Sequence, residues 1–168
     1  MSKNKYANLF NYFRQCPMLS KLWSVAAVEE HGVRVILPQG ASPAWQYRER
    51  KDVYGNYYCD KIPNVSLFED FQINCYEWYD TKDNSNPESN LNVLTLEEVE
   101  SICEWIKEQD NARNYPDIGE DIVSIECEPF VPQIRDVIPE EDTICYFITV
   151  RIRYVNKAET VPIEINAN

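Results

Sequence analysis

The sequence predicts an α+β domain, in which an antiparallel β-sheet carries helices packed on one face. Two segments, 65–79 and 144–155, alternate side chains as long strands do. Two other segments repeat apolar residues every three or four positions, which is the spacing of an amphipathic helix. Because 168 residues fit one domain, we expect residues 1–168 to form a single unit.

The last strand segment is the most regular in the chain. Its β-branched and aromatic residues place six apolar side chains on one face, namely Ile144, Tyr146, Ile148, Val150, Ile152 and Tyr154. The other face ends in Arg151 and Arg153, as expected of a strand that runs from covered sheet to an exposed end. Segment 65–79 predicts a second long strand, and segment 121–128 predicts a shorter one that Pro129 closes.

The first 62 residues predict one helix, two short strands and a hairpin. Apolar residues at helical spacing define a helix over 5–15, which Pro17 ends. The runs W-S-V-A-A-V and V-R-V-I-L predict strands joined by a turn. Within residues 43–62, two aromatic-bearing runs flank Tyr54, Gly55 and Asn56, and Gly and Asn adopt the positive φ of a tight hairpin turn.

Three segments are expected to lie outside regular structure. Residues 80–92 are nearly all Asp, Asn, Ser, Lys or Pro and predict a mobile polar loop. Residues 130–142 contain two prolines and are expected to form a turn before the last strand. The tail from residue 157 is expected to be extended and available to bind a neighbouring molecule.

Thr95 and Glu98 match a capping box and predict that a second helix starts at Thr95. Four glutamates stack along the polar side of this helix, namely Glu97, Glu100, Glu104 and Glu108. Like charges at i and i+4 oppose helix formation by about 0.2–0.5 kcal/mol per pair. The stripe is therefore either a solvated helix face or an acidic wall that faces a pore or a basic partner.

Charge is distributed unevenly along the chain, whose net charge is −12. Residues 1–61 hold nine Lys or Arg against five Asp or Glu, a net of +4, whereas residues 62–168 hold seven against twenty-three, a net of −16. The overall acidity argues against an ordinary nucleic-acid binder, which has a basic footprint. Either the charge only keeps the protein soluble, or opposite ends of successive copies complement each other and close a ring.

The predicted hairpin carries a group of basic residues, Arg48, Arg50 and Lys51, interleaved with tyrosines. Such a pattern occurs where bases stack and phosphates bind, but the remaining acidic surface would repel phosphate. Basic side chains also keep an exposed strand edge from pairing with other strands. Of the two kinds of partner, we expect these residues to bind a protein.

The sequence contains no pattern that predicts catalysis or a cofactor. It lacks a phosphate loop, a metal-ligand cluster, a nucleophile elbow and a dinucleotide fingerprint. His31, the only histidine, is expected to be a turn residue, and Glu126 and Glu128 are expected to be surface residues. We therefore expect a chain without enzymatic activity, cofactor or metal.

The six cysteines never occur as C-x-x-C and are expected to be reduced thiols of the core. Residues 1–10 show no charged and then apolar leader, and no apolar run approaches the roughly 20 residues of a membrane helix. We therefore expect a soluble chain that is made in the cytosol and has no membrane partner.

Short motifs along most of the chain resemble the tail-terminator or tail-completion proteins of tailed bacteriophages, some of which are called minor capsid proteins. The motifs are C-P-M-L at 16–19, E-W-Y at 77–79, T-x-x-E from Thr95 with E-W-I at 104–106, and Y-F-I-T-V-R-I-R-Y at 146–154. The resemblance implies a non-enzymatic α+β subunit of the virion neck, assembled in the cytoplasm of the host. It also implies a hexameric ring that caps the tail tube and meets the head connector. The chain departs from the family pattern in its longer 21–62 region and in the 80–92 loop.

The resemblance and the charge pattern lead to one hypothesis. The genome must pass such a ring without binding, and an acidic lumen repels phosphate. The stripe from Glu97 to Glu108, or the acidic 120–142 region, would line that channel, and the basic residues of the hairpin would contact the adjacent protomer or the tube. Two alternatives stay open: a phage-encoded acidic inhibitor that mimics DNA and binds a host protein, and a small enzyme that uses His31 or the Glu126 and Glu128 pair.

Overall fold

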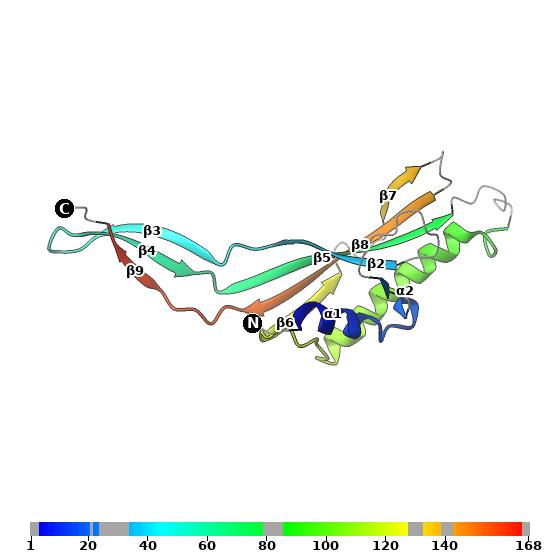
Figure 1. The fold of residues 1–168 in the computed structure, drawn as a ribbon, viewed down its shortest axis with the longest axis horizontal. Helices are drawn as coiled ribbons and strands as arrows, with labels where there is room; N and C mark the ends of the chain where they lie inside the picture. The colour runs from blue at the N-terminus through cyan, green and yellow to red at the C-terminus, as the bar shows by residue number, and fades with distance from the viewer. Residues whose placement is uncertain are drawn as a thin grey trace.

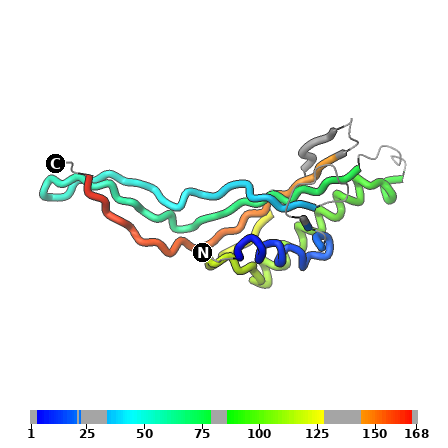
Figure 2. Tube along the Cα trace, in the orientation of Figure 1, coloured from blue at the N-terminus to red at the C-terminus, as the bar shows by residue number. Residues whose placement is uncertain are grey.

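The computed structural model describes residues 4–20, 22–23, 34–78, 86–127, 133–138 and 143–165. The molecule is elongated and has two parts, a body in which helices cover a sheet and a long arm made of a second sheet (Figures 1 and 2). The predicted α+β class is confirmed. The strands are divided between two sheets, because the hairpin and the C-terminal segment pair with each other and not with the main sheet.

The sheet of the body is built around two long strands, β5 (Ser66–Trp78) and β8 (Thr143–Val155). They pair antiparallel over their whole length, from Ser66 opposite Val155 to Trp78 opposite Thr143. The other strands are β1 (Leu22–Trp23), β2 (Arg34–Ala41), β6 (Ile122–Cys127) and β7 (Gln133–Ile138). The order is β1-β2-β5-β8-β6, with β7 on the other half of β8, and only β1 and β2 are parallel.

Two helices, α1 (Lys5–Phe13) and α2 (Leu91–Asn111), lie on the same face of this sheet (Figure 1). A 3-10 turn, η1 (Pro17–Leu19), follows α1 and packs beside α2. The predicted apolar face of β8 is buried beneath the helices, where Ile148, Val150 and Ile152 are at most 2% exposed. The hydroxyl of Tyr12 donates to the carbonyl of Asn114 at 2.8 Å, which links α1 to the segment after α2.

The predicted start of α2 at Thr95 is wrong. Asn90 caps the helix, because its side-chain Oδ1 accepts from the backbone N–H groups of Asn92 at 3.0 Å and Val93 at 3.1 Å. Asn is as strong an N-cap as Ser or Asp. Thr95 lies inside the helix and donates its hydroxyl to the carbonyl of Leu91 at 2.7 Å. The predicted loop over 80–92 is therefore too long, and its residues 80–85 lie outside the described part.

The predicted turn over 130–142 contains a strand instead. β7 pairs antiparallel with β8, from Gln133 opposite Phe147 to Ile138 opposite Thr143. The two prolines lie before and after this strand in the sequence, so they remove none of its hydrogen bonds. Composition suggests a turn because it carries no information about the edge of β8, which supplies the hydrogen-bond partners of the strand. Most of the predicted strand W-S-V-A-A-V, at 23–28, and the turn with His31 lie outside the described residues.

All six cysteines lie in the described part and are free thiols; four are buried, as predicted for core thiols, whereas Cys59 and Cys127 are only partly buried. Cys75 is completely buried in β5, and burial raises the pKa of its thiol from 9.0 to about 12. The unfolded chain therefore loses this proton at a lower pH than the folded chain does. At a pH between the two pKa values, the folded chain keeps the thiol proton that the unfolded chain has lost. The free energy of unfolding therefore falls as pH rises.

We expect the free energy of unfolding to fall above pH 9, with a contribution from Cys75 of up to about 1.4 kcal/mol per pH unit. Urea unfolding of the wild type and of Cys75→Ala, measured between pH 8 and 10, checks this, and the variant should show the shallower slope. Cys59→Ala, which removes a partly exposed thiol, is the matched control. Equal slopes for wild type and Cys75→Ala would contradict the assignment.

Candidate interaction surfaces

The arm is a three-stranded antiparallel sheet of β3 (Trp45–Lys51), β4 (Tyr57–Pro63) and β9 (Val161–Glu164), in the order β3-β4-β9. The predicted hairpin of β3 and β4 is confirmed. At its tip, one carboxylate oxygen of Asp52 accepts from the backbone N–H groups of Tyr54 and Asn56, both at 2.9 Å. These hydrogen bonds, that of Asn56 first, lower the pKa of Asp52. Gly55 has φ +85°, a conformation that favours glycine, whereas the positive φ predicted for Asn56 is wrong.

The C-terminal segment is extended, but it pairs with its own chain. β9 runs antiparallel to β4, from Tyr58 opposite Glu164 to Lys61 opposite Val161. Pro162, which has no N–H to donate, is tolerated because β9 is an edge strand. The segment that the sequence predicts to be available to a neighbour therefore completes the arm.

One face of the arm is apolar and open to solvent. Strand register places five exposed apolar side chains on it, namely Tyr47 (62% exposed), Tyr57 (50%), Val161 (46%), Ile163 (42%) and Ile165 (49%). We call these five residues the apolar face. Lys51, Lys61 and Glu49 share this side of the sheet. The ammonium groups of Lys51 and Lys61 lie 5.2 Å and 4.3 Å from the ring centres of Tyr57 and Trp45.

The opposite face of the arm carries two of the three predicted basic residues, Arg48 and Arg50. Nε of Arg50 donates to Oδ2 of Asp60 at 2.7 Å, and its guanidinium carbon lies 4.3 Å from the ring centre of Tyr58. The side chain of Asp60 is only 6% exposed, so Arg50 compensates a nearly buried carboxylate within the arm, and loss of Arg50 would leave that charge unpaired. Lys51 therefore lies on a different surface from Arg48 and Arg50, as the alternation along a strand already implies.

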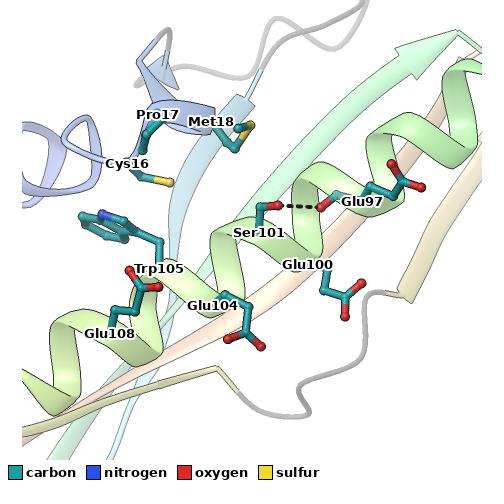
Figure 3. A pocket seen from close by; sticks show the side chains of 9 residues that line it. All are labelled: Cys16, Pro17, Met18, Glu97, Glu100, Ser101, Glu104, Trp105 and Glu108. Carbon is teal, nitrogen blue, oxygen red and sulfur yellow. Dashed lines mark hydrogen bonds between the residues drawn. The ribbon is translucent and has the colours of Figure 1, made fainter.

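The predicted acidic stripe is exposed along α2 and borders a groove. The groove has a volume of about 670 Å³, lies between α2 and η1, and is lined by Cys16, Pro17, Met18, Glu97, Glu100, Ser101, Glu104, Trp105 and Glu108 (Figure 3). We call it the α2–η1 groove. Apolar side chains line the groove beside the glutamates, because Met18 is 40% exposed and Trp105 is only partly buried.

The stripe does not present all its side chains in the same direction. Trp105 and Glu108 approach η1, whereas Glu100 and Glu104 extend from the side of α2 that faces away from η1 (Figure 3). Trp105 is held in place by the ring of Tyr12, whose centre lies 5.4 Å away. The sequence identifies the stripe but misses the groove, because the motif C-P-M-L gives no sign that it folds against α2.

Of the candidate catalytic residues, only Glu126 lies within the described part of the chain. Glu126 accepts from the hydroxyl of Ser124 at 3.0 Å and lies 3.4 Å from Nε of Arg153, contacts that stabilise the sheet. Glu128 and His31 lie outside the described residues. Among the residues that the structure describes, no group of three or more His, Cys, Asp or Glu side chains is placed to hold a metal ion.

None of the helices in the described ranges is both long enough and apolar enough to cross a membrane. Comparison with known protein families finds no family model that matches the chain, and comparison with curated protein sequences finds no significant relative.

Proposed function

We propose that this chain is a structural virion protein of a tailed bacteriophage, a tail terminator that forms a ring at the head–tail junction and caps the tail tube. In this proposal the ring is a hexamer, assembles in the host cytoplasm and contacts the tube on one side and the head connector on the other. It has no catalytic role. Genomic DNA passes through the ring without specific binding.

The observation that carries the proposal is the separation of two unlike surfaces on one elongated protomer. The apolar face belongs to the strands of the arm and the α2–η1 groove to helical elements of the body, and the arm and the body form opposite parts of the elongated molecule (Figure 1). A surface at one end that complements a different surface at the other end gives a head-to-tail contact, which closes into a ring when the rotation permits. The ammonium groups of Lys51 and Lys61 on the apolar face and the glutamates of the groove carry opposite charge, which supports the same kind of contact.

The acidic stripe supports the second part of the proposal, a channel that does not retain DNA. Glu100 and Glu104 are exposed and extend away from η1 (Figure 3), so they remain available to face a lumen when the groove is occupied. Carboxylates that face DNA repel its phosphates. Unlike Lys or Arg, they do not release the counterions of the DNA, and this release is what drives binding. Arg48, on the face of the arm opposite Lys51, would then contact the tube.

The test is the mass of the purified chain by light scattering at low and at moderate salt, followed by negative-stain imaging of any large species. We expect a closed ring with six times the mass of the protomer, and weaker association at moderate salt because exposed charge pairs are screened. Antibody raised against the chain should label the head–tail junction of virions from the phage that encodes it. Virions without label, or a monomer that binds a basic host protein in a salt-sensitive way, would overturn the proposal, and the second result would favour the inhibitor.

A further inference from the structure

We infer that the apolar face of the arm of one copy docks into the α2–η1 groove of a second copy. This inference rests on the ring proposed above and names the two surfaces that form its repeated contact. Each copy would contribute an arm to one neighbour and a groove to the other.

The arm requires a partner because it is a single layer. Its five apolar residues are each at least 42% exposed, and no described segment of the chain covers them. Contiguous apolar patches on soluble proteins mark interaction sites. The same residues form no core of their own, since the two clusters of buried residues lie in the body.

The chemistry of the groove matches that of the apolar face. Lys51 and Lys61 hold their ammonium groups above aromatic rings on this face, so positive charge is embedded in apolar surface. The groove offers the reverse combination, because Glu97 and Glu108 line it together with Met18 and Trp105, while Glu100 and Glu104 lie at its outer edge. Packing of the apolar face against Met18 and Trp105 would remove apolar surface from water. The lysines would form ion pairs with the glutamates at the edge of the contact.

The other face of the arm fits the groove less well. Its charges balance, because Arg48 and Arg50 lie with Asp60 and Glu164, whereas the apolar face carries two lysines and only one acid, Glu49. A nucleic acid is a poor occupant of the apolar face, because a chain with net charge −12 repels phosphate. A second copy supplies the matching acidic groove without any further component.

The first test is a charge-reversal cycle, read by sedimentation equilibrium. Lys51→Glu with Lys61→Glu on the arm, and separately Glu97→Lys with Glu108→Lys in the groove, should each weaken self-association at least about tenfold. A chain with all four changes should recover much of the loss, because the reversed arm of one copy meets the reversed groove of the next. Matched controls are Arg48→Glu on the opposite face of the arm and Glu88→Lys outside the groove, and both should associate like the wild type.

The second test maps the contact in the otherwise unchanged chain and does not depend on the stability of a charge variant. A photo-crosslinking benzoylphenylalanine replaces Tyr47, and light and heavy isotope-labelled chains are mixed so that crosslinks between copies are identified by mass. We expect crosslinks from position 47 to residues 16–18 or 97–108 of another copy. Far-ultraviolet circular dichroism checks that the substituted chain is folded.

The remaining outcomes overturn the inference in distinguishable ways. Crosslinks from the arm of one copy to the arm of another would replace it with an arm-to-arm dimer, and crosslinks only to another protein would assign the arm to that protein. A ring that forms without crosslinks to the groove would leave the proposed function standing and remove this contact. A chain that stays monomeric at every concentration would overturn this inference, whereas labelling of the virion neck would still support the proposed function.

Discussion

Replacing Phe13 with alanine should lower the free energy of unfolding by about 3–5 kcal/mol. Phe13 is the last residue of α1 and is completely buried. Its ring packs edge-on against Tyr12, with centres 5.2 Å apart, and lies 6.4 Å from the ring of Trp105. Alanine would leave a cavity between α1 and α2 that neither helix can close without losing its contacts with the sheet.

Urea unfolding followed by tryptophan fluorescence and far-ultraviolet circular dichroism measures this effect. Tyr6→Ala, on the exposed side of the same helix at 54% exposure, is the matched control and should change the free energy of unfolding by less than about 0.5 kcal/mol. A loss below about 1 kcal/mol for Phe13→Ala would mean that α1 is not docked as described. Because η1 follows α1 in the chain, the same variant should also weaken binding of the arm of a second copy in the α2–η1 groove.

Removing residues 160–168 should release the arm and leave the body folded. β4 would lose the strand that pairs with it from Tyr58 to Lys61, and a two-stranded hairpin is marginally stable in water. We expect amide hydrogen exchange in residues 45–51 and 57–63 to speed up at least about tenfold, because local opening then costs less free energy. Amides of β5 and β8 should keep their protection, since their hydrogen bonds lie within the sheet of the body.

Hydrogen exchange read by mass spectrometry separates the two regions directly. A chain that lacks only residues 166–168 is the control and should exchange like the wild type, because β9 ends at Glu164. Loss of protection in β5 and β8 on removal of residues 160–168 would show that the arm and the body unfold together. Unchanged protection in β3 and β4 would show that the hairpin is stable without β9.

Local patterns predict several elements correctly, and each of them depends on neighbours in the sequence. Alternation along β5 and β8 identifies both long strands and the buried face of β8, because side chains in a strand point to opposite faces in turn. The hairpin turn follows from the conformational freedom of Gly55. The same alternation separates Lys51 from Arg48 and Arg50, although the sequence pattern first groups the three as one basic patch.

The candidate surfaces, too, are predicted in part by the sequence and decided in part by the tertiary structure. The glutamates of α2 follow from the sequence, since a helix brings residues three and four apart onto one side. That Met18 and Trp105 lie beside them depends on how η1 packs against α2. That Arg50 pairs with Asp60 depends on the register of β3 and β4.

The sequence by itself therefore determined the periodic elements, the exposed acidic stripe and the turn of the arm. Only the tertiary structure decided that β9 joins the hairpin to form a separate sheet, that β7 extends the edge of β8, and that α2 begins after Asn90. The physical reason is that the pairing of strands joins residues far apart in the chain, whereas periodicity records only which side chains share a face. A start at Asn90 is also available locally, because Asn ranks above Thr as an N-cap, but the capping-box match of Thr95 and Glu98 points to the later residue.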